Sequence, residues 1–567
     1  MTSQLLVPIA ATLAFYALYH LAKMVHKDYV NPLRNLPGPK GGNVVTGHFR
    51  HVMQVSGPVF RFVWDAYQWN SLWKDHATPD KWREEFGANY QSRGFFNTRD
   101  LYTTDTRALT HVLMNDHIYQ KGPVAHRILT HFLGNGLLSV ETAEHKRQRK
   151  ILNPAFGVPQ IRSLTDIFNR KSVQLRDIWL RDIGQDSNPF RVDVFASLRK
   201  MTLDVIGEAG FKYQFNALDP NGQPNDLEAA FTRLMHSPQA QRQAGMRLLQ
   251  AEIPILGLLP TPGGKVVEEA RLKMINIAKK LLADSQTDIK AGGESATQRD
   301  LLSLLVKSNT SHEIQEHQRL SDAEVIAQIP TFFVAGHETT STATALALHA
   351  LSVHPKVQMK LREELLTLKT DNPTMDDLNS LPYLESVLRE IMRVYPPVGF
   401  SVREAMEDDV LPLSKSYLDR NGNTYDTIPI RKGTSIRIPI SAVHRDTEIW
   451  GADAAVFRYC MAEIDFIALM PHRPERWENI PEAASAIPSV WANLLTFLAG
   501  NHNCIGFRFS LVEIKSLLFT LVRAFEFEAA VPEDTIGFSP TPVRRPNVIT
   551  ELDGGNQLPL LVRPCLA

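Results

Sequence analysis

The sequence feature that most restricts the fold lies near the C-terminal end, in a run from Phe497 to Gly506 around a single cysteine, Cys504. Gly500 and Gly506 flank this cysteine. Glycines permit positive φ angles and a close approach of the backbone to a large flat ligand. No second cysteine stands two or three residues away, which argues against a zinc or iron–sulfur site. The run therefore fits either a buried structural cysteine in a turn or the single thiolate ligand of a haem iron.

Charge and cysteine content exclude several classes of protein. The 567-residue chain has 61 Lys+Arg and 61 Asp+Glu, so its formal charge gives no reason to expect a nucleic-acid partner. Its three cysteines, Cys460, Cys504 and Cys565, do not make a disulfide framework. We therefore expect the catalytic part of the chain in a reducing compartment.

The start of the chain predicts a membrane anchor. Residues 5–22 carry no formal charge, and as a helix they would span about 27 Å, close to the thickness of a bilayer core. Lys23 and Lys27 follow, so the positive-inside rule places the rest of the chain in the cytoplasm. A cleaved signal peptide is the alternative, but a charged n-region and a clear cleavage site are missing. We predict an anchor over residues 1–22 and a basic Pro-Gly-Pro hinge over residues 23–45.

One long helix is predicted over residues 321–351, with the Ser and Glu spacing of a capping box at its start. It is apolar almost all round, so it should be buried. Gly336, Glu338 and Thr339 interrupt this apolar surface. Together they predict a local widening where a small molecule lies against the helix and receives protons from Thr339 and Glu338. The alternative is that the threonines bond to carbonyl groups of their own helix.

Two groups of charged residues are candidates for fixed roles. His145 and Arg149 are four residues apart in a basic helical segment, so they share a helix face and could grip two carboxylates of a ligand. A solvated basic face is the alternative. Glu390 and Arg393 are three residues apart, so they could form an ion pair within one helix. A third charged residue would hold that pair in a buried, fixed geometry.

These motifs, in this order, resemble the cytochrome P450 family of haem-thiolate monooxygenases from Leu36 onward. The cysteine run matches the family pattern Phe-x-x-Gly-x-Arg-x-Cys-x-Gly, with His502 in place of the usual Arg. The haem-contacting Trp-x-x-x-Arg of the family appears here as His145 and Arg149. The sequence around Cys504 is most similar to that of fungal members.

The resemblance implies a mainly α fold with small β-sheets (α+β), in a haem-thiolate monooxygenase domain over residues 46–567 preceded by one transmembrane helix. It implies haem b as cofactor, with Cys504 as the axial ligand of the iron. Thr339 and Glu338 would deliver protons during oxygen activation. The structural charge triad would be Glu390, Arg393 and Arg476. The other residues implied to contact the haem are His145, Arg149, Arg403, Phe497, Gly500, His502 and Gly506.

The implied activity is that of an oxidoreductase that uses O2 and electrons from NADPH-cytochrome P450 reductase. It would hydroxylate or otherwise oxidise a hydrophobic small molecule, in terpenoid-like secondary metabolism. The alternatives are a xenobiotic-oxidising enzyme of broad specificity, an O2-independent haem-thiolate isomerase or dehydratase, and an inactive haem binder. The anchor implies a single-pass protein in the lipid of the endoplasmic reticulum membrane, with its catalytic domain in the cytoplasm. Family analogy places residues 110–133, 248–259 and 398–402 at the substrate pocket.

One segment departs from the family pattern. Residues 459–473 separate Phe457-Arg458 from Pro474-Glu475-Arg476-Trp477, two stretches that are continuous in the family. One hypothesis is a short retained intron of fifteen codons. The rival interpretation is a surface loop, where long insertions are tolerated. Its position just before Arg476 means that it could disturb the charge triad.

Overall fold

The computed structural model describes most of the chain beyond its N-terminal segment. The described ranges are residues 28–42, 47–48, 77–94, 98–184, 188–219, 264–290, 300–310, 315–454, 473–539, 541–551 and 554–565, with a few single positions between them. The regular structure is mainly helical with small sheets, as the sequence predicts. The chain forms two compact units. The smaller unit is Met1–Phe62, Asp75–Gly122 and Ser401–Pro439, and the larger is Val63–Lys74, Pro123–Phe400 and Ile440–Ala567.

A five-stranded sheet forms the centre of the smaller unit, in the order β1-β2-β8-β5-β3. Strands β2 and β8 are parallel, and the other neighbours are antiparallel. A separate hairpin pairs β6 with β7. The strands are β1 (Asn89–Arg93), β2 (Arg99–Thr103), β3 (Tyr119–Gln120), β5 (Ser401–Ala405), β6 (Asp409–Leu418), β7 (Thr424–Ile430) and β8 (Ser435–Ile438). The helices are η1 (Pro32–Asn35), α3 (Ala77–Phe86) and α4 (Thr106–Met114).

The described part of the predicted hinge is packed against this sheet. Leu33 and Leu36 are buried, and the N–H of Gln91 in β1 donates to the carbonyl of Pro37 over 2.8 Å. Among the described residues, no helix is long and apolar enough to span a membrane. Most of the predicted anchor, residues 1–22, lies outside those residues.

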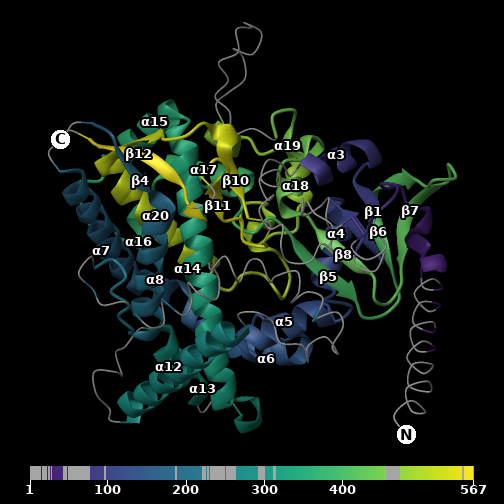
Figure 1. The fold of residues 1–567 in the computed structure, drawn as a ribbon, viewed down its shortest axis with the longest axis horizontal. Helices are drawn as coiled ribbons and strands as arrows, with labels where there is room; N and C mark the ends of the chain where they lie inside the picture. The colour runs from purple at the N-terminus through teal and green to yellow at the C-terminus, as the bar shows by residue number, and fades with distance from the viewer. Residues whose placement is uncertain are drawn as a thin grey trace, which may run out of the picture. The chain divides into compact units, whose positions relative to one another are not determined.

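The larger unit is built around helix α14 (Asp322–Ser352), which runs beside α8 (Val194–Phe211) and α20 (Phe507–Ala524) (Figure 1). The predicted capping box is present, because the Ser321 hydroxyl accepts the Glu324 N–H and the Glu324 carboxylate accepts the Ser321 N–H. Most of the 31 residues of α14 are buried, as its apolar sequence predicts.

Shorter helices and two small sheets complete this unit. The other helices are α5 (Pro123–Leu133), α6 (Thr142–Leu152), η4 (Asn153–Phe156), α7 (Val158–Ile183), α12 (Gly264–Lys290), α13 (Leu301–Thr310), η7 (Glu316–Gln318), α15 (Pro355–Leu365), α16 (Met375–Asn379), α17 (Pro382–Val394), α18 (Ile440–His444), α19 (Thr447–Trp450), η8 (Arg473–Glu478), η9 (Glu482–Ala486), η10 (Leu495–Phe497) and η11 (Glu533–Thr535). The strands are β4 (Phe190–Asp193), β9 (Phe525–Ala529), β10 (Ile536–Phe538), β11 (Pro546–Val548) and β12 (Pro559–Pro564). They form the antiparallel sheets β4-β12-β9 and β10-β11.

Candidate active site

Cys504 lies in a tight loop between η10 and α20. Its N–H donates to the carbonyl of Phe497 over 2.9 Å. Gly500 has a φ of 68°, a value that favours glycine because a side chain would be strained there. The backbone N–H and the side-chain amide of Asn503 both donate to the Gly500 carbonyl, at 3.2 and 2.7 Å. The loop therefore fixes the thiol through backbone hydrogen bonds that it makes within itself.

The Cys504 thiol lies deep among protein atoms but keeps accessible surface. Burial raises the pKa of the Cys504 thiol, while the Gly506 N–H and the positive charge of Arg149 act in the opposite direction. The aromatic side chains of Phe497 and Phe509, which precede and follow the thiol in sequence, are buried. The loop thus combines an accessible thiol with buried aromatic side chains on either side of it in sequence.

A short stretch of α14, like the Cys504 thiol, has surface that is accessible to solvent. Ala335 is exposed and Thr339 half-buried, although the helix is otherwise almost fully covered. Phe156 connects this stretch to the cysteine loop. Its ring centroid lies 5.3 Å from that of Phe332 in α14, and a Cβ added at Gly506 would lie 3.7 Å from its Cε1 atom. The open surface of α14 and the cysteine loop therefore belong to one region of the larger unit.

Gly336 and Thr339 serve the helix itself in this structure. A Cβ added at Gly336 would lie 3.1 Å from Ile206 of α8, so the glycine permits close packing of the two helices. The Thr339 hydroxyl donates to the carbonyl of Ala335 over 2.7 Å. This is the helix-bonding alternative of the sequence analysis, and it leaves the hydroxyl oxygen able to accept a second hydrogen bond.

Glu338 is buried beside two arginines and a histidine. Its carboxylate lies 2.6 Å from Arg545 Nε, 3.3 Å from His337 Nε2 and 3.8 Å from Arg199 Nε. The two guanidinium groups supply positive charge next to this buried carboxylate. Sequence reasoning missed Arg545 and Arg199, because they lie far from Glu338 in the chain and carry no local motif.

The predicted basic residues gather at the cysteine loop. The rings of His145 and His502 stack with centroids 3.8 Å apart, and His502 Nε2 lies 3.1 Å from Glu141 Oε2. Arg149 donates from Nη1 to the Asn503 carbonyl at 2.6 Å and from Nη2 to the Asn503 side chain at 2.7 Å. Arg149 therefore joins α6 to the residue that precedes the cysteine, a partner that the sequence did not reveal.

The structure also brings Glu390, Arg393 and Arg476 together in the core. Arg393 binds the Glu390 carboxylate through two nitrogens, at 2.9 and 2.7 Å, and both side chains are fully buried. Arg476 Nε lies 3.6 Å from Glu390, and its Nη2 lies 3.0 Å from Asp453. Arg393 Nη1 donates to the His444 carbonyl at 2.6 Å. The triad thus joins α17 to α18 and η8 in the chain that leads to the cysteine loop.

Comparison with known proteins decides the family. The chain matches the family described as Cytochrome P450 over residues 56–545. It belongs to the cytochrome P450 family. It is 44% identical to cytochrome P450 monooxygenase 128 of Postia placenta over 561 residues, which cover 98% of this chain and 96% of the relative.

Two further relatives extend this likeness. Cytochrome P450 monooxygenase 205 of Postia placenta is 43% identical, with 97% of this chain and 96% of the relative covered. Cytochrome P450 monooxygenase claO of Ampulloclitocybe clavipes is 34% identical, with coverages of 86% and 88%. The protein is a cytochrome P450 monooxygenase, whose family uses a haem-thiolate cofactor, O2 and a redox partner.

The residues around Cys504 fit a haem in this P450. The accessible thiol could supply one sulfur ligand, and Ala335 exposes an apolar side chain on α14. His145, Arg149 and His502 place basic side chains beside the loop, where the sequence analysis expects the carboxylates of the cofactor.

Several predicted residues stay predictions. Arg403 lies in the smaller unit, where its Nη1 donates to the Ser401 hydroxyl and to the Val402 carbonyl, both at 2.9 Å. Residues 459–472 of the insert and nearly all of residues 248–259 lie outside the described residues.

Proposed function

We propose that this P450 binds haem b through Cys504 and oxidises a hydrophobic small molecule with electrons from NADPH-cytochrome P450 reductase. The observation that carries the proposal is the pairing of an accessible thiol on the cysteine loop with an open apolar stretch of α14 at Ala335. When bound, haem supplies the redox chemistry with O2. The chain supplies position, charge and protons.

Each residue of the site has a role in this proposal. Arg149 holds the Asn503 backbone and so fixes the direction of the Cys504 sulfur. Thr339, anchored on the Ala335 carbonyl, offers its oxygen as a hydrogen-bond acceptor beside the open surface. Glu338, one residue before Thr339 and held by Arg545, is the carboxylate that we assign to proton delivery.

The nature of the substrate is proposed from the apolar face of α5. Four of its apolar residues are half-buried and recur at helical spacing: Val124, Ile128, Leu129 and Phe132. This helix packs beside α14, so its uncovered apolar side supports a hydrophobic ligand. We place the substrate among terpenoid-like secondary metabolites. Type I spectral shifts with terpenoids, and not with a panel of unrelated drugs, are expected; shifts with most drugs would favour the broad-specificity alternative.

The membrane location is proposed from sequence. The uncharged residues 5–22, followed by Lys23 and Lys27, support a single-pass anchor in the endoplasmic reticulum with the catalytic domain in the cytoplasm. Deleting residues 2–22 is expected to release the protein from the membrane fraction without loss of haem. Protease treatment of intact microsomes should digest the catalytic domain of the full chain. A protected domain would contradict the proposed orientation.

Thr339 provides the test of the monooxygenase reaction. With reductase, NADPH and 18O2, the wild-type protein should place one labelled oxygen in the product. Thr339→Ala should consume NADPH with less product, because the acceptor hydroxyl is lost. Thr344→Ala is the matched control, since Thr344 also donates to the carbonyl four residues earlier, at 2.9 Å, but is fully buried. Product without labelled oxygen, or without NADPH, would favour the isomerase or dehydratase alternative.

A further inference from the structure

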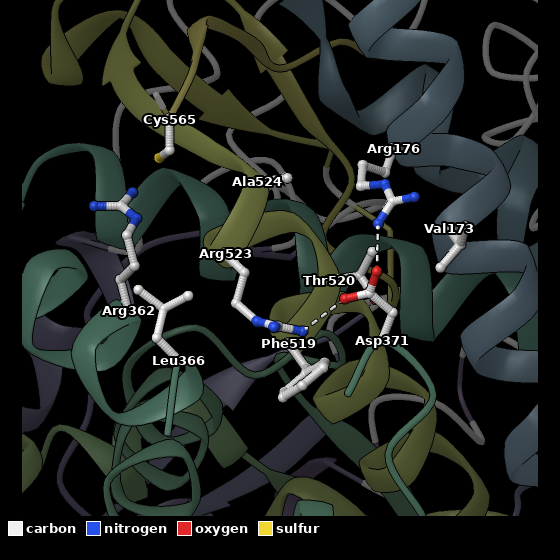
Figure 2. Close-up of a pocket in the computed structure, with 10 residues that line it drawn as sticks. All are labelled: Val173, Arg176, Arg362, Leu366, Asp371, Phe519, Thr520, Arg523, Ala524 and Cys565. Carbon is white, nitrogen blue, oxygen red and sulfur yellow. Dashed lines mark hydrogen bonds and ion pairs between the residues drawn. The ribbon is translucent and has the colours of Figure 1, made fainter. Parts of the chain in front are cut away.

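A cavity of about 390 Å³ lies between α7, the C-terminal end of α15 and the C-terminal end of α20 (Figure 2). Its volume falls in the range of small-molecule sites, about 300–1,000 Å³. Phe519, in its wall, is twelve residues along α20 from Phe507, the first helical residue after the cysteine loop. Twelve helical residues correspond to about 18 Å, so the cavity is separate from the surface around Cys504.

The cavity is lined by more positive than negative charge. Arg176, Arg362 and Arg523 contribute three guanidinium groups, and Asp371 contributes one carboxylate. Figure 2 shows this carboxylate between two of the arginines: Oδ1 lies 3.1 Å from Arg523 Nη1, and Oδ2 lies 3.6 Å from Arg176 Nη1. The side chain of Asp371 is 68% exposed. A carboxylate at this position is thus compatible with both guanidinium groups, and the resident one is held loosely from the solvent side.

Apolar surface lies directly beside these charges. Val173 and Leu366 line the cavity, and the guanidinium of Arg523 lies 4.5 Å from the ring centroid of Phe519. Leu366 is 44% exposed, so an apolar group that enters the cavity would cover it. A cavity that combines arginines with an apolar wall suits a ligand with one anionic end and one hydrocarbon end.

The arginines differ in what they hold. Arg362 donates to the carbonyls of Val522 and Phe525, so it caps the C-terminal end of α20 and adds charge to the cavity. Among the described residues, Arg176 forms ion pairs with the carboxylates of Asp177 and Asp371. Replacing Arg176 therefore changes the charge of the cavity and, among the described residues, removes no hydrogen bond to a backbone carbonyl.

We propose that this cavity binds an amphiphilic carboxylate of the fatty-acid class, with the carboxylate between Arg176 and Arg523 and the hydrocarbon against Val173 and Leu366. Asp371 competes for the same two arginines. The ligand binds reversibly and undergoes no chemistry there. This site is independent of the proposed substrate and of the haem.

The test uses the full-length, haem-loaded protein and calorimetric titration with dodecanoate, while the haem Soret band is monitored for entry at the active site. Arg176→Gln should weaken calorimetric binding at least tenfold and leave the Soret response unchanged. Arg181→Gln is the matched control, because Arg181 lies on the same helix, is 57% exposed and pairs with Asp182. Dodecanol should bind at least tenfold more weakly than dodecanoate.

Two further variants make the test independent of any folding effect at Arg176. Asp371→Asn should tighten dodecanoate binding several-fold, because it removes the competing carboxylate. Val173→Trp keeps every charge and should weaken binding by filling the apolar wall. Equal affinities of Arg176→Gln and Arg181→Gln, equal binding of dodecanol and dodecanoate, or weaker binding by Asp371→Asn would each overturn the proposal.

Discussion

At the scale of single residues, the cysteine loop depends on partners that lie far away in the sequence. His444 Nε2 accepts the N–H of Leu495 at 2.8 Å, at the start of η10. The Arg149 guanidinium holds Asn503 just before the cysteine. The motifs predicted the roles of Cys504 and Arg149 as ligand and donor. They did not predict Asn503 or His444 as supports, because hydrogen bonds between distant segments leave no local pattern.

His444 makes the fold sensitive to acid. Burial, together with the charge of Arg393, lowers the pKa of His444 to about 3. The unfolded chain has a histidine pKa of about 6.5, so it binds the proton first as the pH falls. Stability from neutral His444 is therefore complete above about pH 6.5 and is lost progressively toward pH 3. Between pH 7 and pH 5 the expected loss is about 2 kcal/mol.

His444→Gln checks this expectation, because a glutamine oxygen can still accept the Leu495 N–H but does not titrate. Urea-unfolding midpoints of both proteins would be measured at pH 7 and pH 5. The wild-type protein should lose more stability than the variant over this interval. The same loss in both proteins would show that His444 does not titrate on unfolding.

At the scale of elements, the sequence of α14 predicts the bounds and the burial of the helix but not the residues that it contacts. The capping box and the apolar residues on all sides of the helix predicted a helix over residues 321–351. In the structure this helix is Asp322–Ser352. The sequence places Gly336 at a ligand surface, and this stays a prediction; the structure adds a contact with Ile206 of α8 that the sequence did not predict. Helical periodicity tells which residues are buried, but it does not tell which neighbour covers each of them.

A double-mutant cycle tests this interpretation of Gly336. Gly336→Ala should destabilise the protein, because the added methyl group comes within 3.1 Å of Ile206 and overpacking usually costs about 1–3 kcal/mol. Ile206→Val removes one of the two closest atoms and should recover part of that loss. We expect a favourable coupling of about 0.5 kcal/mol or more in unfolding free energy. Additive effects would indicate that Gly336 is required for another reason.

At the scale of the whole molecule, the family resemblance predicted the mainly helical fold with small sheets. What the sequence could not supply is the partner of each buried charge. Glu338 binds Arg545 across 207 positions of the chain, and this pairing exists only once β11 lies near α14. The insert predicted at residues 459–473 stays a prediction, and it ends three positions before Arg476 of the charge triad.

Deletion of residues 459–473 tests whether the functional protein needs them. The shortened chain should bind haem at least as well as the full chain, because the join restores the continuous family sequence before Arg476. Haem content per protein, from the ratio of Soret to protein absorbance, is the measurement. Sequencing the spliced transcript is the companion experiment. Loss of haem on deletion, or transcripts that always contain these codons, would show that the insert belongs to the protein.

The central claim is that Cys504 is the thiolate ligand of a haem iron, and the absorption spectrum of the reduced, CO-bound protein tests it most directly. We predict the red-shifted Soret band of a thiolate-ligated haem in the wild-type protein and in the control Cys565→Ser. Cys504→Ser should lose that band, because serine offers no thiolate. A thiolate-type band that survives in Cys504→Ser, or that is absent from a haem-loaded wild-type protein, would contradict the assignment.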